Sequence, residues 1–199
     1  MGQGDSERIM PVGPRQEGRE GETRMGIPGV RGTDHIGFTV PDLDEAENFL
    51  VDVLGAELVL EQPGACDRHG DMMQRQFGVD PRAEIIKFRF YRMQFGSDYE
   101  VFEWKAKNQR TTVPLNSDIG GHHLALYVDD IDIAVDYLRD RNVDVMGQIV
   151  PSGGGSKGNR FIYFRSPWGM QYELVCYPDG KEYEKHTDKR LWTPVNPGQ

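Results

Sequence analysis

DHIGFTVPDLDEA (residues 34–46) and HHLALYVDDIDIA (residues 122–134) are two versions of one sequence pattern. They are identical at five of thirteen positions, and a constant offset of 88 residues superposes His35 on His123. In both, alternating β-favouring residues lead into an amphipathic stretch. Self-similarity at so long a period indicates a duplicated supersecondary module.

A second pair of similar stretches closes each half of the chain. DYEVFEW (98–104) and QYELVCY (171–177) superpose Tyr99 on Tyr172 and Glu100 on Glu173, at an offset of 73 residues. The two offsets differ by 15 residues, which predicts an insertion in the irregular stretch 62–83 of the first half. Each half therefore begins at a histidine and ends at a glutamate.

Each half is expected to fold as a βαβββ module. Asp42, together with Glu45, and Asp130 are predicted helix N-caps, because each precedes apolar residues at helical spacing. Gly55 and Asn142 are suited to end these helices in the left-handed conformation. The remaining strands are expected at 56–61, 84–95 and 98–104, and at 143–150, 159–166 and 170–177.

Amino-acid composition indicates which kinds of partner and which cellular location the protein is expected to have. The chain has 199 residues, 37% of them hydrophobic, which suffices for one core, and its formal charge of -9 disfavours a nucleic-acid partner. No apolar run reaches the length that spans a bilayer, and no secretion signal is apparent. We expect a cytoplasmic protein with no membrane partner.

The two ends of the sequence are polar and lack periodicity. Residues 1–32 are rich in Gly, Glu and Arg and are expected to form a disordered or loosely docked arm. Residues 178–199 form a C-terminal tail, in which Tyr183, Leu191 and Trp192 are expected to anchor the chain to the body or to a second subunit.

Strand alternation brings the histidines and glutamates of each half together. Glu100 and Glu173 hold a fixed place in the last strand of each half, and the histidines hold one in the first. The residues that share a face with the histidines are Gly37 and Thr39 in the first half and Ala125 and Tyr127 in the second. If the two modules pair by pseudo-twofold symmetry, two His and two Glu meet on one concave surface, as in an octahedral metal site.

Together with SPWGMQYELV (166–175), the two histidine stretches resemble the vicinal oxygen chelate superfamily of glyoxalase I, methylmalonyl-CoA epimerases, extradiol dioxygenases and bleomycin-binding proteins. The resemblance covers residues 33–177, with one module at 33–105 and the other at 121–177. It implies an α+β fold in which two tandem βαβββ modules form a cupped mixed sheet around a metal site. It also implies four ligands to a divalent metal ion, namely His35, Glu100, His123 and Glu173.

The chemistry implied by this ligand set is proton transfer next to a carbonyl group. Two neutral imidazoles and two carboxylates leave two octahedral positions of Ni, Zn, Co or Mn for adjacent substrate oxygens. The metal would stabilise an enediolate, while resemblance to glyoxalase I implies Glu173 as the base and Glu100 as the group that returns the proton. We expect an isomerase, epimerase or lyase acting on a small molecule, and the resemblance makes a homodimer the expected assembly.

Two other functions remain open from the sequence. His35, His123 and Glu173 alone could form the Fe(II) facial triad of an extradiol ring-cleaving dioxygenase. A metal-free, ligand-binding resistance protein is the third possibility. Thr39 stands where glyoxalase I carries a glutathione-binding arginine, which disfavours glutathione. Methylmalonyl-CoA epimerases usually have glutamine in place of Glu100, which leaves an epimerase of another substrate open.

Further residues are assigned provisional roles. The residues expected to contact substrate are Thr39, Tyr127, Met73 and Phe102. Met72, Met73 and Phe77, in the insertion, either form a lid over the groove or fill a gap in packing. His122 faces the other side of its strand, where a structural role is expected, and His69 and His186 are expected to face solvent. Cys66 and Cys176 are expected to be free thiols.

The glycine-rich stretch SGGGSKGNR (152–160) matches the spacing G-x-G-x-x-G. A strand follows it, whereas dinucleotide binding by this motif requires a helix N-terminus. A flexible hairpin loop is therefore expected, from which Lys157 and Arg160 could reach an anionic group of the substrate.

Overall fold

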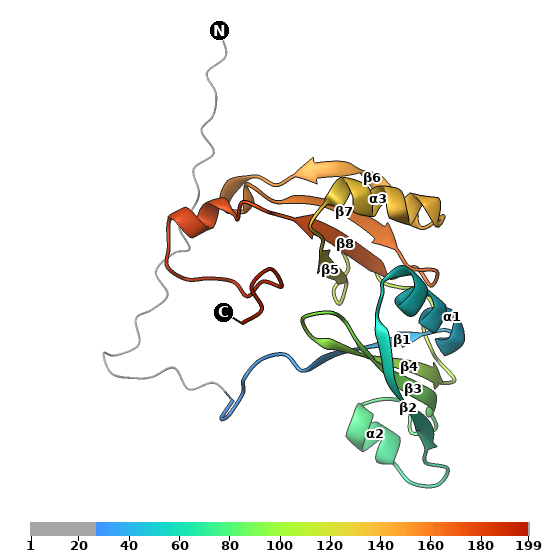
Figure 1. Ribbon diagram of the computed structural model, residues 1–199. Helices are drawn as coiled ribbons and strands as arrows, with labels where there is room; N and C mark the ends of the chain where they lie inside the picture. The colour runs from blue at the N-terminus through green and yellow to red at the C-terminus, as the bar shows by residue number, and fades with distance from the viewer. Residues whose placement is uncertain (1–26, 199) are drawn as a thin grey trace.

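The computed structural model describes residues 27–198, which form two four-stranded sheets (Figure 1). The strand order is β1-β4-β3-β2 in the first sheet and β5-β8-β7-β6 in the second. In each sheet the first strand is parallel to its neighbour and the other pairs are antiparallel. The predicted α+β fold of two βαβββ modules is confirmed. Most of the expected N-terminal arm lies outside the described residues.

The first module consists of β1 (His35–Val40), α1 (Leu43–Glu47), the π-helix η1 (Asn48–Val53), β2 (Glu57–Cys66), α2 (Met72–Phe77), β3 (Glu84–Arg92) and β4 (Asp98–Lys105). The second module consists of β5 (His123–Tyr127), α3 (Ile131–Asp140), β6 (Asp144–Pro151), the 3-10 turn η2 (Gly154–Ser156), β7 (Arg160–Arg165) and β8 (Gln171–Cys176). A second 3-10 turn, η3 (Glu182–Lys185), lies in the C-terminal tail.

The helices begin and end as their capping residues predict. The Asp42 carboxylate accepts hydrogen bonds from the backbone N–H groups of Asp44 and Glu45, at 2.8 and 2.9 Å. Asp130 caps α3 in the same way. Gly55 and Asn142 adopt positive φ angles of 75° and 57° after the two helices. Each of the two N-caps, Asp42 and Asp130, stabilises its helix by about 1 kcal/mol.

The first helix differs from the prediction in its second half, which widens into a π-helix. Residues Asn48–Val53 form η1, and the backbone N–H of Leu54 bonds to the carbonyl of Phe49 at 3.1 Å. The hydrophobic stripe predicts which side chains are buried, but the extra residue in this turn changes where they point. Phe49 and Leu50 are both buried within η1.

The insertion is more regular than its sequence suggests. Strand β2 continues to Cys66, opposite Glu84 of β3, and α2 follows it. Pro63 and Gly64 look irregular in sequence, but β3 supplies the pairing partner that orders them. Gly64 fits because a Cβ there would lie 2.0 Å from the carbonyl oxygen of Ile85. In α2, Met73 is fully buried, which favours the packing role over the lid role and leaves Met73 unable to contact substrate as expected.

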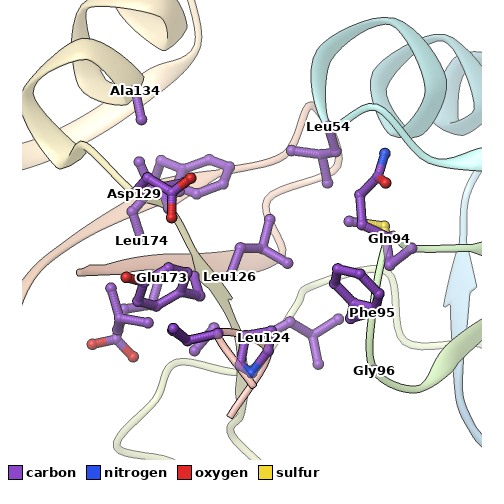
Figure 2. Close-up of a pocket in the computed structure, with 18 of the residues that line it drawn as sticks. Leu54, Gln94, Phe95, Gly96, Leu124, Leu126, Asp129, Ala134, Glu173 and Leu174 are labelled. Carbon is purple, nitrogen blue, oxygen red and sulfur yellow. The ribbon is translucent and has the colours of Figure 1, made fainter. Parts of the chain in front are cut away.

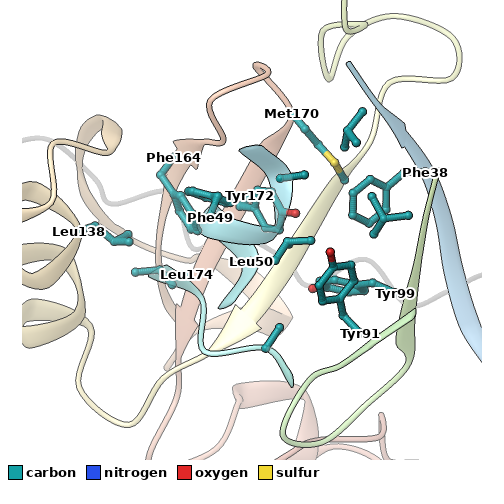
Figure 3. Close-up of a cluster of buried hydrophobic side chains, with 14 of the residues drawn as sticks. Phe38, Phe49, Leu50, Tyr91, Tyr99, Leu138, Phe164, Met170, Tyr172 and Leu174 are labelled. Carbon is teal, nitrogen blue, oxygen red and sulfur yellow. The ribbon is translucent and has the colours of Figure 1, made fainter. Parts of the chain in front are cut away.

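One hydrophobic core joins the two modules (Figure 3). The ring of Phe49, from the first module, packs 5.5 Å from Trp168 and 5.9 Å from Tyr172 of the second, measured between ring centroids. Phe38 of β1 also stacks on Trp168, at 6.5 Å. Burying a phenyl ring contributes about 1.5–3 kcal/mol, so Phe49 is a main link between the modules.

Arg89 of β3 ties α1 to the first sheet. Arg89 is 8% exposed, and its guanidinium bonds to the carboxylates of Asp44, Glu61 and Glu47, at 2.7, 2.6 and 3.0 Å. It also donates to the backbone carbonyl of Leu43, at 2.9 Å. The buried charge is thus well compensated, and this network fixes the helix over its own sheet.

Replacing Phe49 by alanine tests the shared core. We expect Phe49→Ala to lower the free energy of unfolding by about 3–5 kcal/mol, because a large cavity would open between the modules. Urea denaturation followed by far-UV circular dichroism measures this. Ile119→Ala, at a fully exposed site, should change the value by less than about 0.5 kcal/mol. Equal effects of both variants would contradict a core that spans the modules.

Candidate functional site

The first predicted pair of ligands is brought together by β1 and β4. Their parallel register aligns Gly37 with Glu100, and the Nε2 atom of His35 lies 3.2 Å from Oε2 of Glu100. The other ring nitrogen of His35, Nδ1, lies 2.8 Å from Oδ2 of Asp34. This hydrogen bond to Asp34 raises the pKa of His35. It also fixes the orientation of the ring, so that Nε2 points towards Glu100.

The second pair repeats this geometry on β5 and β8. Ala125 aligns with Glu173, and the Nε2 atom of His123 lies 3.0 Å from Oε2 of Glu173. The ring of Tyr163 packs edge-on against His123, with 5.2 Å between ring centroids. Burial raises the pKa of the Glu173 carboxyl, while the nearby His123 and Lys181 act in the opposite direction.

Both pairs fit a divalent metal ion. Two donors that bind one ion at about 2.1 Å and at right angles are about 3 Å apart, which matches both nitrogen–oxygen distances. The side chains of His35 and Glu100 are 39% and 19% exposed, and those of His123 and Glu173 are 35% and 13% exposed. Each pair is therefore both preorganised and open to an incoming ion.

The four predicted ligands do not meet within one chain. The two pairs lie on different sheets, and within residues 27–198 no group of three or more His, Cys, Asp or Glu side chains is placed to hold a metal. The reason lies in the alternation along the strands. Tyr172 and Leu174 of β8 are buried in the core, so Glu173 between them points the opposite way. The complete four-ligand site stays a prediction.

The strands that carry the histidines are both edge strands. In the described part of the chain, β1 is paired only with β4, and β5 only with β8. A groove of about 1160 Å³ follows β5 (Figure 2). Leu124 and Leu126 line it from one face of the strand, and His123 and Glu173 line it from the other. The β3–β4 hairpin forms its opposite wall through Gln94–Gly96.

The predicted substrate contacts occupy different settings. Thr39 is exposed on the face of β1 that carries His35, and Phe102 stacks on Phe88 at 5.1 Å on the face that carries Glu100. Tyr127 lines the groove and packs edge-on against Tyr177, at 4.9 Å. Phe77, for which a lid role and a packing role were both open, packs its ring against Trp104 at 5.7 Å.

Lys181 and Tyr177 were missed by sequence reasoning. The Lys181 ammonium lies 4.0 Å above the ring of Tyr177, and both residues line the groove beside Glu173. They lie at the end of the repeated pattern or beyond it, where a lysine in a polar tail carries no signal. A Tyr following the final strand of the repeat was the only available hint.

The remaining candidates have structural or solvent-facing positions. Residues 152–159 form a hairpin loop with the turn η2, and Arg160, the first residue of β7, is paired with Asp132 at 2.8 Å. His122 lies 3.1 Å from the carbonyl of Gly120, and His69 and His186 are exposed. Cys66 is exposed and Cys176 buried, both as free thiols.

None of the helices in the described range is long and apolar enough to cross a membrane.

Comparison with known proteins identifies relatives of this arrangement. The family model described as Glyoxalase/Bleomycin resistance protein/Dioxygenase superfamily matches residues 34–164. A 2-epi-5-epi-valiolone epimerase from Actinomyces sp is 42% identical over 174 residues, which are 86% of this chain and 93% of the relative. The mitochondrial methylmalonyl-CoA epimerase of Bos taurus is 26% identical over 141 residues, 71% of each chain.

A solved structure supports the same fold. A glyoxalase family protein from Bacillus cereus superposes with a TM-score of 0.59 at 19% identity, over 76% of this chain and 97% of that chain.

Proposed function

Because this chain belongs to the glyoxalase/bleomycin resistance protein/dioxygenase superfamily, we propose that it is a divalent-metal-dependent epimerase that moves a proton at a carbon next to a carbonyl group. The 42% identity to an epimerase over most of both chains supports an epimerase over a dioxygenase or a binding protein. One observation supports the proposed metal: in each module a histidine nitrogen lies close to a glutamate oxygen, at 3.2 Å in the first pair and 3.0 Å in the second.

The proposed substrate class is a polyhydroxylated cyclic ketone of the valiolone type. The more similar of the two curated relatives is named for such a compound, and the other for an acyl-CoA thioester. Both compounds carry a carbonyl group that acidifies the neighbouring carbon. A hydroxy ketone also offers two adjacent oxygens, which suits two vacant metal positions better than a thioester does.

Inversion at one carbon requires proton removal on one face and proton delivery on the other. Glu173 is the proposed base and Glu100 the proposed acid, because they come from different modules and can approach the substrate from opposite sides. When bound, a divalent metal would supply the Lewis acid that polarises the substrate carbonyl. Tyr163 packs against His123 of the second pair, and Tyr127 lines the groove beside it.

The complete site requires a second copy of the chain in this proposal. His35 and Glu100 of one protomer would face His123 and Glu173 of its partner across a twofold axis. Three observations support this arrangement: the pairs lie on faces turned away from the shared core, β1 and β5 are edge strands, and a groove follows β5. Moving the pairs together within one chain would instead require breaking the core around Phe49.

The reaction is tested with 2-epi-5-epi-valiolone in deuterium oxide. We expect epimerisation with incorporation of solvent deuterium at the inverted carbon, since the base exchanges its proton with solvent. Glu173→Gln should lower kcat by about 10²–10⁴-fold, provided that elemental analysis shows the metal retained. Glu57→Gln, which alters only a surface ion pair, is the control. Turnover without deuterium incorporation would contradict proton transfer by the protein.

Metal dependence is tested by elemental analysis of protein purified without chelator. We expect one Ni, Zn, Co or Mn per chain, loss of activity on removal with EDTA, and recovery on adding the ion back. His35→Ala and His123→Ala should each reduce bound metal, whereas His186→Ala, outside both pairs, should not. Stoichiometric iron that survives Glu100→Ala would favour the ring-cleaving dioxygenase, and full activity without metal would contradict the proposal.

The shared site is tested by mixing two inactive variants. One carries His35→Ala and Glu100→Ala, and the other carries His123→Ala and Glu173→Ala. If partners share sites, half of the mixed dimers are heterodimers with one intact site in two, so activity should recover to about a quarter of wild type. Mixing under mild denaturant allows exchange, and size-exclusion chromatography checks that dimers re-form. No recovery from exchanged dimers would show that each site belongs to one chain.

A further inference from the structure

Lys181 is a half-buried cation at the candidate site, and the proposed reaction gives it no role. It follows β8 in the C-terminal tail, and its Nζ atom lies 4.0 Å from the centre of the Tyr177 ring. It lines the groove beside Glu173 and also lines a smaller cavity of about 530 Å³ beneath the tail. The ammonium therefore stands between the two hollows.

The Lys181 ammonium makes no hydrogen bond or ion pair with any residue that the structure describes, although two other lysines do. Lys87 is paired with Asp44 and Lys185 with Glu182, each at 2.8 Å. Burial lowers the pKa of Lys181, an effect opposed by the nearby carboxylates of Glu184 and Glu173. The three N–H donors of the Lys181 ammonium therefore lie beside the groove without an acceptor from the described residues.

A partly desolvated charge without an acceptor is unfavourable unless a ligand or water supplies one. The Tyr177 ring compensates part of the cost through a cation–π contact, which holds the ammonium in place without using its N–H groups. Such an ammonium is ready to donate to an oxygen that enters the groove.

The tail that carries Lys181 is fixed at several points. The Tyr177 hydroxyl lies 3.0 Å from Oγ1 of Thr193, and the backbone N–H of Leu191 donates to the Tyr183 hydroxyl at 3.0 Å. The Trp192 ring lies against Gly96 in the β3–β4 hairpin, where an added Cβ would be 3.6 Å from it. The tail thus docks on both modules, and these contacts on either side of Lys181 fix its position.

We propose that Lys181 is a substrate-binding residue that donates a hydrogen bond to a hydroxyl oxygen of the polyhydroxylated ketone, other than the two oxygens expected at the metal. This inference rests on the proposed function. Lys181 and Glu173 belong to the same module, so the bond would fix the ring of the substrate relative to the base. Lys181 would therefore select for substrates that carry a hydroxyl group at that position.

Steady-state kinetics with 2-epi-5-epi-valiolone test this assignment. Lys181→Met keeps the apolar stem and removes the donors, and we expect it to lower kcat/KM by about 10–100-fold, mainly through KM. Lys181→Arg should recover part of the loss. Lys185→Met, four residues further on and bound only to the exposed surface of η3, is the matched control and should match wild type. Thermal unfolding and metal content should be unchanged in all three.

Deoxy analogues of the substrate locate the contact. Removing the hydroxyl that Lys181 binds should raise KM for wild type but not for Lys181→Met, because the same bond is lost in both cases. If wild type epimerises the ketone and Lys181→Met has the same KM, the inference is wrong and the proposed function stands. A loss of kcat, metal or stability in Lys181→Met would show a structural role and would also overturn it. If wild type neither binds nor converts the ketone, both proposals fail together.

Discussion

The alternation of side chains along β1, β4, β5 and β8 is the constraint on which both the core and the candidate site depend. In β4, Tyr99 and Val101 are buried and Glu100 between them faces the other way. In β8, Tyr172 and Leu174 enclose Glu173 in the same manner. A slip of one residue in either strand would bury a carboxylate and expose an aromatic ring, so the core holds the ligand pairs in register.

This constraint explains which features the sequence could predict. The repeat, the two caps and the alternation are local patterns, and they correctly predicted the modules and the helix starts at Asp42 and Asp130. Alternation also placed the histidine and glutamate of each half on one face, where they lie 3.2 and 3.0 Å apart, but it could not show whether the two pairs meet. The π-helix η1 carries no local sequence signal that distinguishes it from an α-helix. The extension of β2 depends on a partner distant in sequence, β3, which pairs with the strand on both sides of Gly64. Lys181 was missed for a similar reason, because its setting is created by the folding of the tail over β8.

The two modules contribute walls of different chemical character. On the first sheet, His35 and Glu100 lie beside an aromatic stripe, in which Phe90 contacts His35 edge-on at 6.0 Å and Phe102 stacks on Phe88. On the second, tyrosines and Lys181 surround His123 and Glu173. In the proposed dimer, a substrate would meet an apolar wall from one protomer and a hydrogen-bonding wall from the other. Such asymmetry suits a ring compound whose two faces differ in polarity.

The strand order of the first sheet places most of the insertion away from the candidate site. In the order β1-β4-β3-β2, the ribbon of β2 and β3 that carries α2 lies at the opposite edge from β1. Its turn is closed locally, by three backbone N–H groups on the Asp67 carboxylate. The β2–α2 turn can therefore vary in length without displacing His35 or Glu100, whereas α2 is tied to the candidate site, because Phe77 packs against Trp104 of β4, the strand that carries Glu100. One end of the insertion is thus free to diversify, while the other is held by the strand that positions the carboxylate.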